Sequence, residues 1–256
     1  MHSNVFALSR MPSLKRDELA DIRARLSSAP PRARELKGAS VLVGKNGIIA
    51  EIKRSSPSTG RISDGSAASI ASRYEKAGAL AVSVLTDRTH FGGTWDDLAD
   101  AANAVKVPVL CKEFICSPWQ IDLATTLGAD IVLLIARMLS RRDLSSLYRH
   151  ALDSGISPLI EVHERNEIDE VLSLSPNVLM VNTRNLSTLR MEPDIAFSTL
   201  SSIPRGITRV CASGIESAVD ISRVRKNTET GIFLIGTALM RASTPEKLFK
   251  EMCNVR

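Results

Sequence analysis

The segment 48–60 joins an apolar run to two charged side chains whose spacing suits catalysis. Glu51 and Lys53 stand two residues apart in a strand-like sequence, and a loop rich in Ser, Pro and Gly follows. Side chains two residues apart in a β-strand point to the same side, so this carboxylate and this ammonium share one face. Burying unpaired charges costs free energy. We therefore interpret the pair as part of a site that moves protons or binds an anion.

Polar residues also interrupt or end other apolar runs of the chain. Lys112, Glu161, Asn182 and Arg184 all stand in this position. A partly desolvated lysine can act as a general acid or bind an anion, and a nearby carboxylate can pair with it. The alternative for Lys112 and Glu161 is a buried ion pair that only closes the fold. His163, which ends the same run as Glu161, is expected to support the site or to end its strand rather than to catalyse.

The last two apolar runs carry a different signal. They end in Ser213-Gly214 and in Gly236-Thr237, each before a helical pattern. Glycine lets the backbone approach a ligand, and backbone amides at the start of a helix attract anions. Either pair alone fits a plain turn, but both together predict a phosphate site. Apolar residues near the same ends are predicted to line an aromatic pocket: Pro57, Phe91, Phe114, Leu133, Leu186 and Leu234.

These residues need a scaffold that brings strand ends together. Eight apolar runs rich in Val, Ile and Leu read as strands buried on both faces, over Ile48–Lys53, Ala81–Asp87, Pro108–Lys112, Ile131–Ala136, Pro158–His163, Val178–Thr183, Thr208–Ala212 and Ile232–Gly236. Helical patterns lie between them, over Ala67–Ala77, Trp95–Val105, Pro118–Leu127, Ser140–Ser154, Asn166–Ser173, Ile195–Leu200, Glu216–Lys226 and Pro245–Met252. An open doubly wound sheet is the alternative, but the chain has neither GxGxxG nor GxxxxGK[ST]. The alternation predicts the α/β class and a (β/α)8 TIM barrel, with its active site at the carboxyl ends of the strands.

Length and composition restrict the organisation of the chain. With 256 residues and 44% hydrophobic content, we expect a single barrel domain over 1–256, in which 1–40 is an N-terminal extension with a helix at Leu14–Leu26. The net charge of +5 is scattered and aromatic residues make up only 4%, so we expect no nucleic-acid partner. The cysteine spacing suggests neither a metal site nor a disulfide framework. Without a signal-peptide pattern or a membrane-spanning run, we expect a cytoplasmic protein without membrane contact, as a monomer or weak homo-oligomer.

Seven ordered motifs resemble the indole-3-glycerol phosphate synthase family of tryptophan biosynthesis, over nearly the whole chain. They are Ile49-Ala50-Glu51-Ile52-Lys53-Arg54-Ser55-Ser56-Pro57-Ser58; Ser83-Val84-Leu85-Thr86-Asp87 with Phe91-Gly92-Gly93; Lys112-Glu113-Phe114-Ile115; Leu159-Ile160-Glu161-Val162-His163; Asn182-Thr183-Arg184-Asn185-Leu186; Ser213-Gly214-Ile215; and Leu234-Ile235-Gly236-Thr237-Ala238-Leu239-Met240-Arg241.

The resemblance implies a carboxy-lyase that needs no metal and no cofactor. Its substrate would be the phosphorylated anion 1-(2-carboxyphenylamino)-1-deoxyribulose 5-phosphate, and its products indole-3-glycerol phosphate, CO₂ and water. By analogy, Lys112 is the general acid, and Lys53 engages the substrate carboxylate or serves the dehydration. Glu51 and Glu161 supply acid–base function. The resemblance further implies that Asn182 and Arg184 orient the substrate, and that the phosphate is surrounded by Ser56, Ser213, Gly214, Gly236 and Thr237.

One position departs clearly from the family pattern. The family usually has Glu-Ser-Gly where this chain has Ala212-Ser213-Gly214. The missing carboxylate could leave Lys112 or Arg184 without a partner and could shift acid–base work onto Glu51. Two alternatives to an active synthase follow: a specialised paralogue with a substituted substrate, or a weakly active barrel with a binding role. A related isomerase is a further rival, but it would place a Cys on the first strand and an Asp on the sixth.

Overall fold

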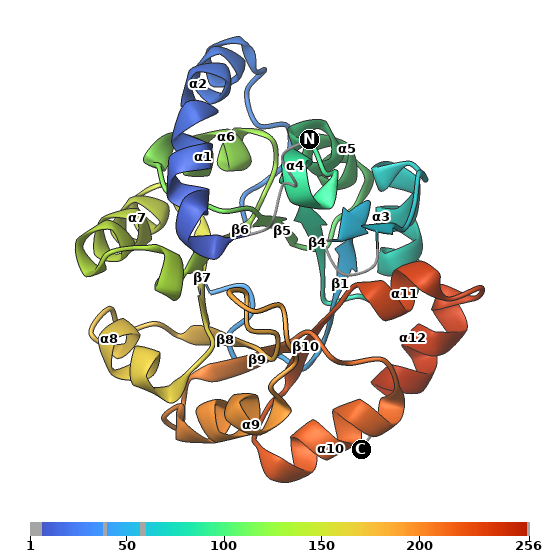
Figure 1. Ribbon diagram of the computed structural model, residues 1–256. Coiled ribbons are helices and arrows are strands. Elements are labelled where there is room, and N and C mark those ends of the chain that lie inside the picture. The colour runs from blue at the N-terminus through green and yellow to red at the C-terminus, as the bar shows by residue number, and fades with distance from the viewer. Residues whose placement is uncertain (1–6, 38–39, 57–59, 255–256) are drawn as a thin grey trace.

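Eight parallel strands form a closed barrel in the computed structural model, which describes residues 7–37, 40–56 and 60–254 (Figure 1). The barrel strands are β1 (Gly47–Ile52), β4 (Ala81–Leu85), β5 (Val109–Lys112), β6 (Ile131–Ile135), β7 (Ser157–Val162), β8 (Val178–Asn182), β9 (Thr208–Ala212) and β10 (Ile232–Ile235). Each strand pairs with its neighbours in chain order, and β1 pairs with both β4 and β10, which closes the ring. The predicted TIM barrel is confirmed.

Helices surround the strands, as Figure 1 shows. The α-helices after β1 are α3 (Ala67–Lys76), α4 (Arg88–Phe91), α5 (Trp95–Ala104), α6 (Pro118–Thr126), α7 (Arg141–Asp153), α8 (Ile168–Leu172), α9 (Pro193–Ser202), α10 (Ala218–Asn227), α11 (Thr237–Arg241) and α12 (Pro245–Cys253). The 3₁₀ turns are η1 (Leu8–Arg10), η2 (Ala136–Met138) and η3 (Arg165–Glu167). No helix within the described ranges is long and apolar enough to cross a membrane.

Local side chains start and stop these elements. Thr94 accepts a hydrogen bond from the backbone N–H of Asp97, whose carboxylate accepts from Thr94 N–H in return, so α5 begins with a capping box. Gly128 ends the turn after α6 with a φ of +103°, and a Cβ there would lie 2.7 Å from the Cβ of Ala102. Only glycine combines that backbone angle with such close packing.

Strand alternation divides the apolar residues into two layers. Ile48, Ala50 and Ile52 face outward and pack with the helices, whereas Ile49 faces the barrel interior. Glu51 has the same parity as Ile49, so its side chain also points inward. The interior cluster fills the barrel below the strand ends. The polar residues at those ends therefore rest on a packed apolar floor.

The N-terminal segment contacts both ends of the barrel. It begins with η1, α1 (Met11–Asp17) and α2 (Leu19–Ser28), and α2 packs beside α6 (Figure 1). The single helix predicted at Leu14–Leu26 is wrong, because the helix breaks at Glu18, whose carboxylate accepts from Lys15 Nζ. Further along, Leu42 is buried in the interior cluster near the amino ends of the strands.

Several predicted boundaries shift where side chains cap the next element. The strand predicted to reach Asp87 ends at Leu85, because Asp87 accepts the N–H of His90 and begins α4. The helix predicted over Asn166–Ser173 divides into η3 and α8. Part of the loop predicted after Lys53 is ordered as two short antiparallel strands, β2 (Ser55–Ser56) and β3 (Gly60–Arg61).

Candidate active site

A cavity of about 220 Å³ opens at the carboxyl ends of the barrel strands. All six side chains predicted to be catalytic line it: Glu51, Lys53, Lys112, Glu161, Asn182 and Arg184. They come from β1, β5, β7 and β8 or from the residues directly after them. In the described part of the chain, no group of three or more His, Cys, Asp or Glu side chains is arranged to hold a metal ion.

Glu51 lies between two lysines. Its Oε2 is 2.6 Å from Lys112 Nζ, and its Oε1 is 3.2 Å from Lys53 Nζ. Burial alone would raise the pKa of Glu51, but the two ammonium charges outweigh it and lower the pKa to about 2. Burial would lower the pKa of Lys112, but Glu51 and Glu161 together raise it. This cluster therefore holds an ionised carboxylate and protonated Lys112 at neutral pH.

Gly236 makes room for this arrangement. A Cβ on Gly236 would lie 2.3 Å from Glu51 Oε1 and 3.0 Å from its Cδ, closer than real contacts allow. Any side chain there would push the Glu51 carboxylate away from its lysines. Gly236 was predicted as a phosphate contact, and its position beside Glu51 adds a steric reason for glycine.

Glu161, Asn182 and Arg184 form a second polar group. The backbone N–H of Arg184 donates to Asn182 Oδ1 at 3.0 Å, so the Asn182 amide must present Nδ2 to Glu161 Oε1, at 3.1 Å. Glu161 Oε2 is buried and has no hydrogen-bond partner among the described residues. Burial raises the pKa of Glu161, although Lys112 opposes the change. This carboxyl group can therefore exchange a proton through its free oxygen.

An apolar wall adjoins the charged groups. Phe91 and Phe114 face each other with ring centroids 6.2 Å apart, and Leu133, Leu186 and Leu234 complete the predicted set along the cavity. Pro57, predicted for the same pocket, lies outside the described residues. The cavity has further apolar lining that the sequence prediction missed: Leu85, Ile135, Leu189, Met191, Ile215, Ile235 and Ala238.

The loops after β9 and β10 supply the other side of the cavity. Ser213 and Gly214 have φ values of +68° and +71°, a backbone conformation that is uncommon for serine. Gly236, Thr237 and Arg241 also line the cavity, and Arg241 is a cation that the prediction missed. Ser56 belongs to β2, and its side chain is outside what the structure describes.

Ala212 is fully buried and does not line the cavity. It pairs with Asn182 of β8 and Leu234 of β10 in the strand ladder. The expectation that Lys112 loses its carboxylate partner is wrong, whereas Arg184 meets a neutral backbone carbonyl and forms no ion pair with a described carboxylate. Lys112 keeps Glu51, and an Arg184 guanidinium nitrogen donates to the carbonyl of Leu189 at 2.8 Å.

A buried cation behind the site was not found from the sequence. Lys15 of α1 is 2% exposed, and its Nζ lies 2.8 Å from Asp87 Oδ1 and 3.0 Å from Glu113 Oε1. These two carboxylates follow β4 and β5, next to Lys112. The available signal was that Lys15 stands one helical turn after the buried Met11, on the same helix face.

Comparisons with known proteins identify the family of the chain. A family model described as "Indole-3-glycerol phosphate synthase" matches residues 10–252. The chain belongs to the indole-3-glycerol phosphate synthase family. An indole-3-glycerol phosphate synthase of Exiguobacterium sibiricum is 37% identical over 253 residues, which cover 97% of each chain. The synthase of Sulfurisphaera tokodaii is 40% identical, over 78% of this chain and 80% of its own. That of Polynucleobacter asymbioticus is 39% identical, over 83% of this chain and 79% of its own.

Solved structures outside the indole-3-glycerol phosphate synthase family share the fold. A 3-hexulose-6-phosphate synthase matches with a TM-score of 0.63 at 12% identity, covering 82% of this chain and 99% of that one. A thiamine phosphate pyrophosphorylase from Pyrococcus furiosus matches with a TM-score of 0.61 at 14% identity, covering 82% and 94%. Membership of the synthase family makes this chain a carboxy-lyase of tryptophan biosynthesis.

Proposed function

We propose that the cavity closes the indole ring of 1-(2-carboxyphenylamino)-1-deoxyribulose 5-phosphate, with loss of CO₂ and water. The observation that carries the proposal is the charged cluster around Glu51, with Lys112 and Lys53 on its two oxygens. Ring closure needs a proton donor where the carbonyl becomes an alkoxide, and dehydration needs a donor for the leaving hydroxyl and a base. The cavity contains groups for each of these roles.

Lys112 is the proposed general acid of the condensation. The aromatic carbon that bears the carboxylate attacks the ketose carbonyl, and Lys112 donates a proton to the oxygen. The C–CO₂ bond then breaks, and its electrons restore the aromatic ring. Because the pKa of Lys112 is raised by its carboxylate neighbours, the ammonium holds its proton until the substrate oxygen develops charge.

Lys53 and Glu161 are the proposed partners in dehydration. Lys53, which is ion-paired with Glu51, would bind the substrate carboxylate first or protonate the leaving hydroxyl later. Glu161 in its ionised form takes a proton from the newly closed ring through its free Oε2. Asn182 holds the other oxygen of Glu161 and so keeps the free one available. Arg184, at the same rim, is proposed to orient the anionic substrate.

The two remaining walls are proposed to bind the ends of the substrate. The anthranilate ring would pack against the apolar wall that includes Phe91 and Phe114. The phosphate would lie at the loops of Ser213-Gly214 and Gly236-Thr237, with Arg241 as an added cation. Ser56 is kept as a proposed phosphate contact on the family resemblance. Ala212 is fully buried in the interior cluster and does not itself line the cavity, so the structure gives no support for extra room beside a substituted ring. A cytoplasmic location and a monomer or weak homo-oligomer remain part of this proposal.

The assay is the appearance of indole fluorescence from purified protein and the ribulose phosphate substrate. Lys112→Met should lower kcat about a thousandfold by removing the proton donor. The matched control is Lys106→Met, which removes an exposed lysine after α5 and should keep full activity. Substrate binding without any product from the wild-type protein would contradict the synthase proposal. Full turnover by Lys112→Met would contradict only the assignment of the acid.

A further inference from the structure

The loop between β8 and α9 carries one wall of the cavity. Residues 183–192 form this loop, and Arg184, Leu186, Leu189 and Met191 line the cavity. Arg184 and Met191 pair in an isolated antiparallel bridge, so the loop folds back on itself. Contacts that fix this loop against the barrel therefore fix the position of a substrate-facing wall.

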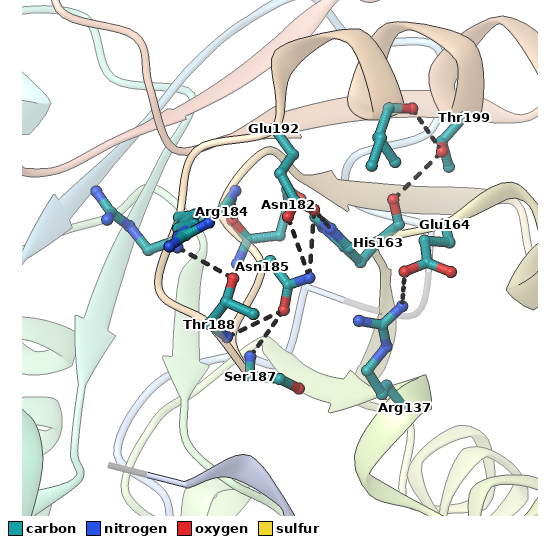
Figure 2. Close-up of polar contacts among 12 residues, drawn as sticks. Arg137, His163, Glu164, Asn182, Arg184, Asn185, Ser187, Thr188, Glu192 and Thr199 are labelled. Carbon is teal, nitrogen blue, oxygen red and sulfur yellow. Dashed lines mark hydrogen bonds and ion pairs between the residues drawn. The ribbon is translucent and has the colours of Figure 1, made fainter. Parts of the chain in front are cut away.

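His163, the residue after β7, makes such a contact (Figure 2). Its side chain is buried, with Nδ1 2.7 Å from the carbonyl oxygen of Asn182 and Nε2 2.6 Å from Glu192 Oε2. Its backbone is held on both sides, because its N–H donates to Glu167 Oε2 and its carbonyl accepts from Thr199 Oγ1. His163 thus joins the end of β8 to the end of the loop.

These two contacts place an oxygen atom beside each ring nitrogen of His163. A carbonyl oxygen only accepts hydrogen bonds, so the Nδ1 of His163 must carry a hydrogen. If Nε2 were bare, its lone pair would face a carboxylate at 2.6 Å, which is repulsive. Hydrogen bonds from His163 and Asn185 lower the pKa of Glu192, so the carboxylate stays ionised. Both contacts are hydrogen bonds only when each ring nitrogen carries a hydrogen, which is the imidazolium form.

Asn185 links the His163–Glu192 pair to the tip of the loop. Asn185 Nδ2 donates to Glu192 Oε2 at 3.2 Å, and Asn185 Oδ1 accepts from the N–H groups of Ser187 and Thr188 at the loop tip (Figure 2).

On the other side, Glu167 and Glu164 share the guanidinium of Arg137, at 2.6 and 2.7 Å. Glu167 also accepts the backbone N–H of His163, so its carboxylate faces the peptide and not the ring. Among these neighbours, Glu192 is the acidic group that meets the imidazole.

We propose that His163 and Glu192 are positioning residues, which as an imidazolium–carboxylate pair hold the 183–192 loop and the Asn182 peptide in the geometry that the reaction needs. Neither residue lines the cavity, so both act through the residues they hold. The proposal rests on the proposed function, because it concerns the same cavity. It predicts a dependence on the charge of the pair that a purely structural role would not produce.

Deprotonation of His163 should loosen the loop. The ionic attraction is then lost and the Nε2 lone pair meets the carboxylate, so we expect kcat/KM to fall about tenfold as His163 loses its proton. The fall should appear mainly in KM, because the loop lines the binding wall. Glu192→Gln should flatten this step, since an amide N–H can donate to neutral Nε2.

The experiment combines kinetics with a readout that needs no turnover. The pH profile of KM is measured for the wild type, Glu192→Gln and the matched control Asp122→Asn. The control changes another histidine–carboxylate pair, His150 with Asp122 at 2.7 Å, outside the site. Nitrogen-15 NMR of the wild type reports ring protonation, with His163 assigned by difference from His163→Gln. If that variant does not fold, variants of the other histidines assign the signal.

The expected NMR result is a His163 ring with both nitrogens protonated at neutral pH, and a lower titration midpoint in Glu192→Gln. A neutral His163 ring at neutral pH in the wild type, or equal midpoints in both proteins, would overturn the proposal. A step in KM that persists in Glu192→Gln would overturn it as well. Failure of the proposed function looks different, because the NMR signature would be present in a protein that forms no product.

Discussion

At the scale of single residues, the pKa values of two carboxylates in one cavity are shifted in opposite directions. Glu51 has two lysines on its oxygens and a pKa of about 2, whereas burial raises the pKa of Glu161. Such divergent environments are the usual way in which a site separates acid, base and counterion roles. The expectation that Glu51 takes over acid–base work from the missing Glu at Ala212 stays a prediction, and the low pKa of Glu51 does not favour it. Glu51 serves as the counterion of its lysines, and Glu161 is better suited to carry a proton.

Replacement of Glu161 by Gln tests this division. Because the base must be ionised, kcat should rise with pH through the pKa of Glu161, which lies above that of an ordinary carboxyl group. Glu161→Gln should lower kcat about a hundredfold and remove this acidic limb. The measurement is the pH dependence of indole formation for both proteins.

The stability of the same variant separates chemistry from folding. A carboxyl group with a raised pKa contributes stability at low pH, which is lost as the pH rises from the unfolded pKa through the folded one. Removing this charge should therefore leave the free energy of unfolding at pH 7 unchanged or higher, as urea denaturation would show. Wild-type kcat with an unaltered acidic limb would refute the role given to Glu161.

At the scale of elements, α1 is held to the barrel by an ion cluster. Lys15 places one ammonium against Asp87 and Glu113, which follow β4 and β5. Thr86 Oγ1 and the N–H of Phe114 donate to the same Glu113 carboxylate, at 2.6 and 2.7 Å. Removing one member of a buried ion cluster leaves the others unpaired, which costs more than the net stabilisation that the intact cluster provides.

Lys15→Met should therefore be strongly destabilising. We expect the free energy of unfolding at pH 7 to fall by about 3–5 kcal/mol, measured by urea denaturation. Burial raises the pKa of Glu113, so this carboxyl group takes up a proton as the pH falls, and the deficit should shrink. The control is Arg16→Met on the exposed face of α1, which should change the free energy by less than about 0.5 kcal/mol. An equal loss in both variants would show that helix packing, not the ion cluster, holds α1.

Sequence patterns predicted the elements of the barrel better than those of the N-terminal segment. Eight buried strands separated by helices fit a closed barrel or an open doubly wound sheet, and the missing Gly-rich nucleotide motifs favoured the barrel. Polar residues inside apolar runs predicted Lys112 and Glu161 in the cavity. No Gly or Pro marks the helix break at Glu18. The break coincides instead with an ion cluster whose members come from three distant segments, which a local sequence pattern does not reveal. Met191 and Arg241 were missed for a similar reason. Both line the cavity because the loop or helix that carries them runs along it, and the spacing of residues in the sequence does not show where a loop or helix runs.

At the scale of the whole molecule, the N-terminal segment forms ion pairs with the barrel at both of its ends. Lys15 binds beside the carboxyl ends of the strands, whereas Asp130 lies at the amino end of β6. Asp130 is fully buried and accepts from Arg32 at 2.7 Å, from the N–H of Lys37 at 3.1 Å and from the N–H of Val109 at 2.9 Å. Arg34 lies 3.3 Å from its second oxygen. Asp130 thus connects residues 32–37 to β5 and β6 on the side of the barrel away from the cavity.

Asp130→Asn should separate stability from catalysis. The amide keeps the shape of the side chain but leaves two arginines without their carboxylate, so we expect a loss of about 3–5 kcal/mol in the free energy of unfolding. Since the catalytic face is at the opposite end of the barrel, kcat/KM measured well below the melting temperature should stay within about twofold of wild type. The control is Asp96→Asn, which breaks an exposed pair with Arg25 and should cost at most about 1 kcal/mol. A large fall in kcat/KM in folded Asp130→Asn would mean that the two ends of the barrel are coupled, and that the N-terminal segment transmits that coupling.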